Sequence, residues 1–145
     1  MTKVQVFVVK CHENATLPQY KTVGSAGCDL TSVVDVIIPT GEWRLVKTGL
    51  MLEIPPGFEG QVRPRSGLAL KHGLTVLNSP GTIDSDYRGE LGVILFNASK
   101  SDYHINVGDS IAQLVIAPVT TASYDQVDMI NATERGNGGY GSTGR

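Results

Sequence analysis

Short apolar segments recur along this chain, and each one stops at a proline or glycine turn signal. The β-branched segment Val33–Ile38 stops at Pro39-Thr40-Gly41, for example. Segments of this length, rich in Val and Ile, favour strands of a sandwich or barrel over helices. The pattern predicts strands over Lys3–Val9, Val33–Ile38, Trp43–Ile54, Phe58–Arg63, Leu91–Phe96, Tyr103–Val107 and Ile111–Val119. We therefore expect an all-β fold.

Only Ser66–His72, which precedes Gly73, has the pattern of a short helix. Seventeen glycines and seven prolines among 145 residues exceed the average combined share of about 12%. This enrichment favours many turns over long helices. The length suits one domain, and no internal repeat or interdomain linker is visible. The chain is therefore predicted to form a single domain.

The charge balance limits the classes of partner. Twelve Lys and Arg residues face 14 Asp and Glu residues, for a formal net charge of −2. Such a balance gives no overall basic surface for nucleic acid, and no apolar run approaches the roughly 18 residues needed to cross a bilayer. We expect neither a nucleic-acid nor a membrane partner. Without a signal peptide at its start, the chain is expected to be cytoplasmic, with Cys11 and Cys28 as reduced thiols rather than a disulfide.

The segment from Gly136 to Arg145 is half glycine. Alone, it has too little apolar surface to offset the entropy lost on ordering, so it is expected to be mobile. One interpretation is a frayed terminus. The other is a clamp for phosphate and a base, made by free backbone N–H groups together with Arg135, Tyr140 and the hydroxyls of Ser142 and Thr143.

Two internal segments carry candidate binding groups. In Pro64-Arg65-Ser66-Gly67-Leu68, a forked cation, a hydroxyl and a glycine N–H suit an anion, although a turn with a surface arginine is the alternative. The polar segment from Asn78 to Glu90 has Asp84 as a candidate general base on water and Tyr87 as a ring for a sugar. A plain hairpin with solvated charges is the alternative there. The histidines show no metal-ligand spacing, which argues against zinc.

Taken in order, five segments closely resemble the five motifs of the trimeric deoxyuridine triphosphatases (dUTPases). They are Ala-Gly-Cys-Asp-Leu (26–30), Pro-Arg-Ser-Gly-Leu (64–68), Gly-Thr-Ile-Asp-Ser-Asp-Tyr-Arg-Gly-Glu (81–90), Gly-Asp-Ser-Ile-Ala-Gln (108–113) and Arg-Gly-Asn-Gly-Gly-Tyr-Gly-Ser-Thr-Gly (135–144). The chain departs from the family pattern at Ser110, where Arg is usual, and at Cys28, where an aromatic residue is frequent.

The resemblance implies a jelly-roll-like β-barrel over residues 1–134, assembled as a homotrimer, and a flexible tail over 135–145 that closes an active site. It implies an enzyme, a dUTP diphosphatase that hydrolyses dUTP to dUMP and pyrophosphate with Mg²⁺. That reaction limits uracil incorporation into DNA and supplies dUMP for thymidylate synthesis. In this family each active site draws on three chains.

The resemblance also assigns roles to residues. Asp84 matches the residue that activates the attacking water, Tyr87 the ring on the deoxyribose, and Asp29 the carboxylate that holds Mg²⁺ through water. The residues that match the uracil-reading hairpin are Asn78, Thr82, Ile83 and Gly92. The residues that match phosphate contacts are Arg65, Ser66, Gly67 and Gln113. The residues that match the closing tail are Arg135, Tyr140, Gly141, Ser142 and Thr143.

Two alternatives remain at this point. A dCTP deaminase has a related fold and similar phosphate motifs, but the complete glycine-rich tail and Asp84 favour the triphosphatase. A nucleotide-binding regulatory module without catalysis is the second alternative. The presence of each proposed catalytic and phosphate-binding residue argues against it.

Overall fold

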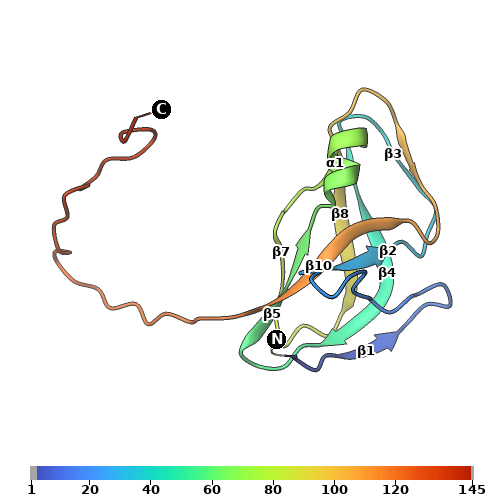
Figure 1. The fold of residues 1–145 in the computed structure, drawn as a ribbon, viewed down its shortest axis with the longest axis horizontal. Coiled ribbons are helices and arrows are strands. Elements are labelled where there is room, and N and C mark those ends of the chain that lie inside the picture. The colour runs from blue at the N-terminus through green and yellow to red at the C-terminus, as the bar shows by residue number, and fades with distance from the viewer. Residues whose placement is uncertain (1–2, 145) are drawn as a thin grey trace.

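The computed structural model describes residues 3–144, and its longest strand, β4, lies inside one antiparallel sheet (Figure 1). Strand β4 (Trp43–Glu53) pairs with β8 (Glu90–Asn97), and the pair is flanked by β1 (Phe7–Lys10) and β6 (Leu74–Val76), in the order β1-β4-β8-β6. The long β4–β8 pair forms the framework of the fold.

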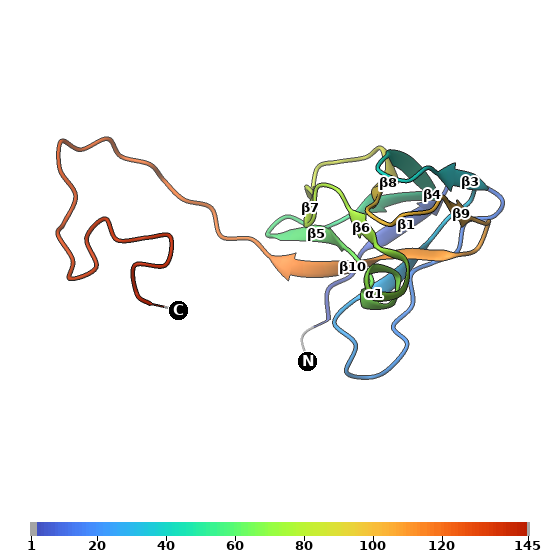
Figure 2. The same ribbon diagram turned by 90° about the horizontal axis from the view of Figure 1, so that it is seen from above.

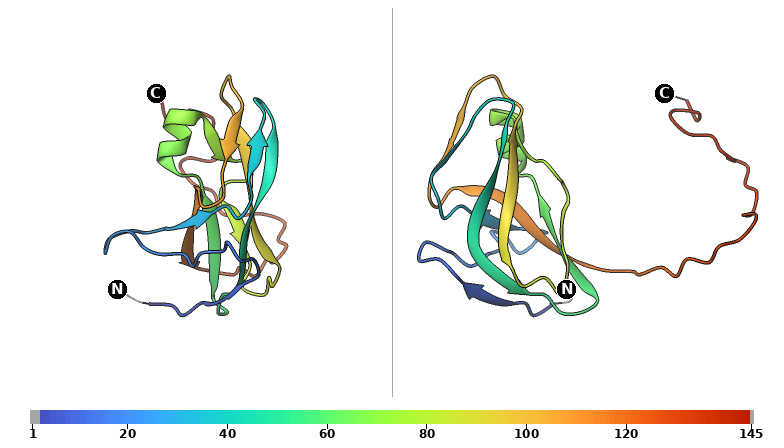
Figure 3. Two further views of the ribbon diagram at one scale, coloured as in Figure 1. Left: turned by 90° about the vertical axis from the view of Figure 1, so that its right-hand side faces the viewer. Right: turned by 180° about the vertical axis from the view of Figure 1, so that it is seen from behind.

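A second four-stranded antiparallel sheet has the order β2-β10-β5-β7. Its strands are β2 (Cys28–Thr31), β10 (Ser110–Pro118), β5 (Phe58–Arg63) and β7 (Gly81–Ile83). Figures 2 and 3 show the β10 and β5 strands on the side of the molecule opposite β4 and β8. A small third sheet pairs β3 (Val36–Ile38) with β9 (Tyr103–Ile105).

Alternation along β8 shows how the sequence forms the core. Leu91, Val93 and Leu95 are buried, while the residues between them are half-buried, because successive side chains of a strand point to opposite faces. Buried side chains of β2, β5 and β10 complete the same hydrophobic cluster. One core therefore holds both four-stranded sheets together.

Asn97 is a fully buried polar residue at the end of β8. Its Nδ2 donates to the carbonyl oxygens of Ile38 and Ser101, at 2.9 and 2.8 Å, and its Oδ1 accepts from the Ser99 N–H at 2.9 Å. Burying an amide is tolerated when its donors and acceptors are satisfied. The side chain fixes the turn after β8 against β3.

The predicted all-β class is confirmed, and so is the predicted helix, since α1 spans Ser66–His72. It ends at Gly73, whose φ of 63° lies in the left-handed region that glycine tolerates best. Each predicted strand segment overlaps an observed strand, with shifted ends at several. The prediction missed β2, β6 and β7, which are short strands at sheet edges.

The predicted barrel is not closed within the single chain. Each four-stranded sheet ends in strands that pair on one side only among residues 3–144. Beyond β10, the chain runs away from the sheets, at first extended and then with turns near residues 136 and 141 (Figures 1 and 2). Within residues 3–144, no helix has the length and apolar character needed to cross a membrane.

Candidate active site

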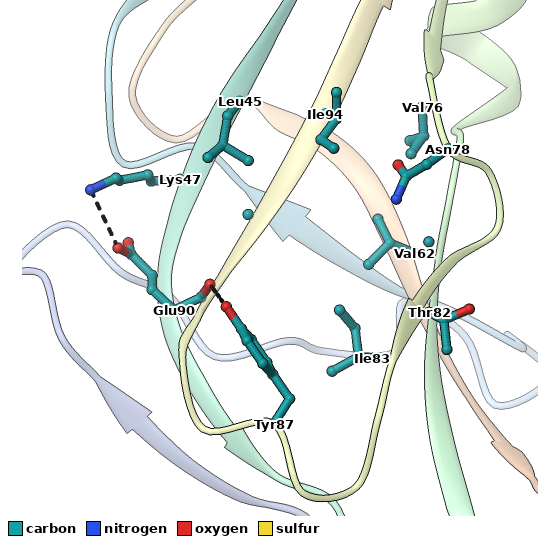
Figure 4. A pocket seen from close by; sticks show the side chains of 12 residues that line it. Leu45, Lys47, Val62, Val76, Asn78, Thr82, Ile83, Tyr87, Glu90 and Ile94 are labelled. Atoms are coloured by element: carbon teal, nitrogen blue, oxygen red, sulfur yellow. Dashed lines mark hydrogen bonds and ion pairs between the residues drawn. The ribbon is translucent and has the colours of Figure 1, made fainter.

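A cavity of about 360 Å³ lies between β8 and the segment that contains β7 (Figure 4). Its walls are mainly aliphatic, and its polar groups come from Asn78, Thr82 and the hairpin between β7 and β8. The residues that line it are Leu45, Lys47, Val62, Val76, Asn78, Gly81, Thr82, Ile83, Tyr87, Glu90, Gly92 and Ile94. The structure thus gathers the residues predicted to read the base and the sugar around one cavity.

Two glycines make room for the cavity walls. A Cβ at Gly81 would lie 3.3 Å from both Nδ2 of Asn78 and Cβ of Val62, so the missing side chain lets the Asn78 amide lie close over β7. A Cβ at Gly92 would lie 2.6 Å from Cδ1 of Leu45. Glycine at these two positions therefore keeps the strands close where the cavity forms.

Asp84 lies just beyond β7, at the start of the hairpin, and its side chain is exposed. Its carbonyl oxygen accepts a hydrogen bond from the Tyr87 N–H at 3.1 Å, which closes the turn. The Asp84 carboxylate does not line the cavity of its own chain. Its predicted role as a general base therefore stays a prediction.

A separate polar cluster forms around Asp29 on β2. Nε of Arg65 lies 3.4 Å from Asp29 Oδ1, and the Ser110 hydroxyl donates to Asp29 Oδ2 at 3.0 Å. Nη1 of Arg65 also donates to the Ser110 carbonyl oxygen at 3.2 Å. Residues from the first, second and fourth motifs therefore meet in one place, with Ser110 in contact with both charged groups.

The fourth motif supplies a further contact near this cluster. Nε2 of Gln113 donates to the Pro64 carbonyl oxygen at 2.9 Å. The Gln113 side chain lies against Gly27, where a Cβ would come within 2.5 Å of its Oε1. Ser66 and Gly67 begin α1 next to Arg65, and the space above Gly67 is open. The backbone there is accessible to an anion.

The cavity and the Asp29 cluster lie at opposite edges of the second sheet. Asp29 belongs to the edge strand β2, whereas Thr82 and Ile83 belong to β7 at the other edge. Strands β10 and β5 lie between them, so three strand spacings of about 4.8 Å separate the edges by roughly 14 Å. Asp29 of one chain therefore lies three strands away from the β7 hairpin of the same chain.

Cys28 precedes Asp29 and points into the protein. Burial raises the pKa of its thiol; a hydrogen bond with Tyr20 lowers that pKa in part, and the nearby Asp29 carboxylate raises it again. Both cysteines are free, Cys28 buried and Cys11 exposed, as the sequence predicted for reduced thiols. The thiol at position 28 is thus a packing group beside the cluster.

The predicted tail residues lie away from both places. Nε of Arg135 donates to the Gly138 carbonyl oxygen at 3.0 Å, and the Ser142 N–H donates to the Gly139 carbonyl oxygen at 3.0 Å. Tyr140, Gly141 and Thr143 lie in the same exposed turns. In the described part of the tail, up to residue 144, the side chains reach neither the cavity nor Asp29. Residue 145 of the predicted tail and residues 1 and 2 of the predicted domain lie outside the described residues.

Several cavity residues were missed in the sequence. Glu90, Lys47, Leu45, Val62, Val76 and Ile94 line the cavity. Val76 lies in the missed strand β6, and the others were assigned only to strands or to solvated charges. The register of β4 on β8 places Lys47 opposite Gly92, and this register brings Lys47 close to Glu90 beside the hairpin. Alternation on either side of the buried Val46 was the one available signal for Leu45 and Lys47.

Comparison with known proteins agrees with these motifs. A sequence model of the dUTPase family matches residues 13–144. The deoxyuridine 5'-triphosphate nucleotidohydrolase of Treponema denticola is 56% identical over 143 residues, covering 97% of this chain and 99% of that protein. The enzyme of the same name from Crocosphaera subtropica is 52% identical over 141 residues, with the same two coverages.

Solved structures point to the same family. The dUTPase of Staphylococcus bacteriophage 80alpha with dUpNHpp has a TM-score of 0.90 and 29% identity, covering 97% of this chain and 99% of that one. A mutant dUTPase from phage phi11 of S. aureus, described with a structural Mg(II) ion, has a TM-score of 0.82 and 28% identity, covering 88% and 99%. Since motif order, family match and fold agree over nearly the whole length, this chain belongs to the dUTPase family.

Proposed function

We propose that this protein is a dUTP diphosphatase, which hydrolyses dUTP to dUMP and pyrophosphate with Mg²⁺. The observation that carries the proposal is the cavity between β7 and β8, because its lining matches the base-reading and sugar-reading residues of the family. The relatives named deoxyuridine 5'-triphosphate nucleotidohydrolase share more than half of their residues with it. The reaction would limit uracil incorporation into DNA and supply dUMP for thymidylate synthesis.

The cavity suits uracil in size and chemistry. Aliphatic side chains such as Val62 and Ile94 pack against a flat ring, while the Asn78 amide and the backbone of Thr82 and Ile83 bind its polar edge. Uracil and cytosine differ in a donor and an acceptor at this edge. A mismatched group left unpaired would disfavour cytosine by roughly 1–3 kcal/mol. In the proposed complex, the hairpin leaves no room for the methyl group of thymine.

The Tyr87 ring forms one wall of the same cavity (Figure 4). In the proposed complex, this ring packs on the deoxyribose and leaves no space for a 2′-hydroxyl. The enzyme would therefore reject UTP by steric exclusion rather than by an additional hydrogen bond. Selectivity for the sugar depends on the ring keeping one position.

The triphosphate would bind at the polar cluster and at the start of α1. Arg65 supplies a fixed positive charge, Ser66 and Gly67 are exposed, and the N-cap of α1 has no side-chain hydrogen bond. The Gln113 amide lies on the same side of β10 as these groups, hydrogen-bonded to Pro64. Several donors and one cation suit an anion that carries multiple negative charges.

The residues present fit Mg²⁺, which prefers oxygen ligands and retains several waters. Asp29 provides a carboxylate beside the phosphate-binding candidates, and its side chain is accessible. Among residues 3–144, no three His, Cys, Asp or Glu side chains gather as a metal cage. As the family resemblance implies, Asp29 would hold the ion through water, while the triphosphate supplies the other oxygens. When bound, Mg²⁺ neutralises charge on the phosphates.

Asp84 would orient the water that attacks the α-phosphorus and accept its proton. Asp84 directly follows β7, the strand proposed to bind the base, and this position supports the role. The water oxygen then bonds to phosphorus, and the bond from the α-phosphorus to the bridging oxygen breaks. Pyrophosphate leaves with that oxygen, and dUMP keeps the new one.

We infer that the active enzyme is a homotrimer of jelly-roll-like subunits with shared sites. The separation of the cavity from the Asp29 cluster within one chain supports this inference, since a dUTP molecule needs both. Residues 1–134 would form the subunit. Residues 135–145 would form a flexible tail that closes a site on another subunit, where Tyr140 stacks over the base and Arg135, Gly141, Ser142 and Thr143 bind phosphates. Light scattering that reports an active monomer of 15.5 kDa would contradict this.

The proposed partners are dUTP and further copies of this chain, without nucleic acid or membrane. We place the enzyme in the cytoplasm, where the nucleotide pool is found. These assignments are consistent with the slightly acidic composition of the chain.

Pyrophosphate release from dUTP tests the proposed function directly. The purified protein with Mg²⁺ should release pyrophosphate from dUTP and much less from dCTP, dTTP and UTP. Ammonia release from dCTP would instead indicate the deaminase. Binding of dUTP without any product would indicate a regulatory module.

A further inference from the structure

We propose that Glu90 is a positioning residue that sets the selectivity for deoxyribose by holding Tyr87 in place. The proposal rests on the proposed function, because it names the group that controls sugar recognition at the same cavity. Glu90 is not a catalytic residue in this proposal. It connects the Tyr87 ring to a rigid irregularity in the neighbouring strand β4.

The position of the Tyr87 ring depends on the residues at the start of β8. The Tyr87 hydroxyl donates to the Glu90 carbonyl oxygen at 3.1 Å (Figure 4). The ring lies so close over Gly89 that a Cβ at position 89 would overlap the hydroxyl. Tyr87 is 46% exposed, so core packing alone does not fix its rotamer. The hydrogen bond to the Glu90 backbone is its main restraint.

The Glu90 side chain in turn fixes that stretch of backbone. Its Oε1 accepts a hydrogen bond from the Gly49 N–H at 3.0 Å, and its Oε2 lies 3.7 Å from Nζ of Lys47. A carboxylate acceptor makes the first contact stronger than a bond between neutral groups. The Lys47 contact is long and the lysine is mostly exposed, so it contributes little.

The Gly49 N–H is available to Glu90 because β4 bulges at this point. Lys47 opposes Gly92 and Met51 opposes Glu90, so the three β4 residues between them face only one residue of β8. Extra residues in one strand interrupt the ladder and leave backbone groups free to bind elsewhere. The Glu90 carboxylate occupies this interruption.

The bulge itself is rigid. Gly49 has a φ of 68°, and a Cβ there would lie 2.8 Å from Cβ of His12 and 2.9 Å from Cβ of Ala15. Its carbonyl oxygen accepts from the Cys11 N–H at 2.8 Å, and the buried Thr48 hydroxyl donates to the Leu91 carbonyl oxygen at 2.5 Å. Glu90 therefore links the half-exposed Tyr87 ring to a well-packed segment.

The consequence concerns the difference between ribose and deoxyribose. If Glu90 loses its carboxylate, the start of β8 loses its link to the bulge, and the carbonyl that anchors Tyr87 becomes free to shift. The ring then samples other rotamers, some of which leave space for a 2′-hydroxyl. Binding of uridine nucleotides should improve relative to deoxyuridine nucleotides.

The experiment compares the binding of dUDP and UDP by calorimetry in wild type and variants, and the kcat/KM for dUTP and UTP. Glu90→Ala should lower the dUDP-to-UDP affinity ratio about tenfold, the size expected for losing a hydrogen bond to a charged group. Its dUTP turnover should change mainly through KM. Glu90→Gln keeps an oxygen acceptor for Gly49 and should restore most of the ratio.

Glu42→Ala is the matched control, because Glu42 forms a shorter ion pair on β4, 2.7 Å from Arg44, outside the cavity. It should leave the ratio unchanged. Tyr87→Phe removes the anchoring hydroxyl on an exposed ring without risk to the core, and it should lower the ratio by itself. Adding Glu90→Ala to Tyr87→Phe should then have little further effect, because both act through one contact.

An unchanged ratio in folded Glu90→Ala overturns the proposal, and so does an unchanged ratio in Tyr87→Phe. Additive effects in the double variant also overturn it, since Glu90 would then act independently of Tyr87. If wild type binds dUDP in preference to UDP but releases no pyrophosphate, the proposed function fails while the Glu90 test remains valid. If wild type shows no preference, Glu90 has no selectivity to set.

Discussion

The Ser110 hydroxyl donates a hydrogen bond of 3.0 Å to Oδ2 of Asp29, at a position where the family usually has arginine. Oδ1 of the same carboxylate faces Arg65. The register between β10 and β2 shifts between Ser110 and Ala112, which turns the serine toward Asp29. The neutral serine thus orients the carboxylate and leaves Arg65 as the cation beside it.

Replacing Ser110 with Ala should weaken Mg²⁺-dependent binding of dUpNHpp by a few-fold to about tenfold, the usual effect of losing one hydrogen bond of about 0.5–1.5 kcal/mol. Ser110→Thr keeps the hydroxyl in a strand that tolerates β-branching, so it should bind as wild type does. Calorimetry with and without Mg²⁺ measures both variants. Equal affinity for Ser110→Ala and wild type would remove the serine from metal binding.

Asp84→Asn should reduce kcat for dUTP by at least about a hundredfold, because the amide orients a water but does not accept its proton. Affinity for dUpNHpp should stay close to that of wild type. Asp86→Asn is the matched control, since Asp86 is also exposed in the same hairpin. If the Asp86 variant loses turnover and the Asp84 variant keeps it, the assignment of the general base is wrong.

A protein that ends at Glu134 should stay folded and trimeric but lose most of its turnover. The described tail residues bond only among themselves and to the adjacent Thr133, so the sheets do not need them. Ordering each tail residue costs about 1–2 kcal/mol, which bound phosphates would have to offset. Steady-state hydrolysis tests this, with circular dichroism and sedimentation as controls. Full turnover of the truncated trimer would make the tail a frayed terminus.

Stability should fall at alkaline pH partly because of Cys28. Burial raises the pKa of its thiol above the ordinary value of 9.0, so the folded state holds this proton more tightly than the unfolded state. The contribution is present below pH 9.0 and is lost as the pH rises through the folded pKa. Tyr20 and Tyr103 act in the same direction, since burial raises both of their pKa values.

Urea unfolding from about pH 8 to about pH 10 measures this effect. Cys28→Ala should lower stability at each pH but show a shallower alkaline decline than wild type. Cys11→Ala is the control, because Cys11 is exposed. An alkaline decline that is identical in the wild type and both variants would exclude the Cys28 thiol as a cause.

The long strands and the helix were predictable from the sequence. Segments such as Trp43–Glu53 contain enough apolar residues in alternation to be recognised as strands. Ser66–His72 is followed by Gly73, a residue type that commonly ends helices. The short strands Cys28–Thr31, Leu74–Val76 and Gly81–Ile83 were not predictable in this way. Each is an edge strand of three or four residues, whose extended form depends on one neighbour supplied by the fold.

Part of the candidate site was likewise predictable from the sequence, and part depends on the tertiary structure. The sequence by itself determined the order of the motifs, and with it the family. It also suggested the residues proposed to read the base, because these lie close together along the chain, between Asn78 and Gly92. Only the tertiary structure brought Asp29 to Ser110 and Glu90 to Gly49. The Asp29–Ser110 contact spans 81 positions of the sequence, and the Gly49–Glu90 contact spans 41. Both contacts depend on strand register and on a bulge. No local pattern specifies them, because register is set when whole strands pack on a shared core.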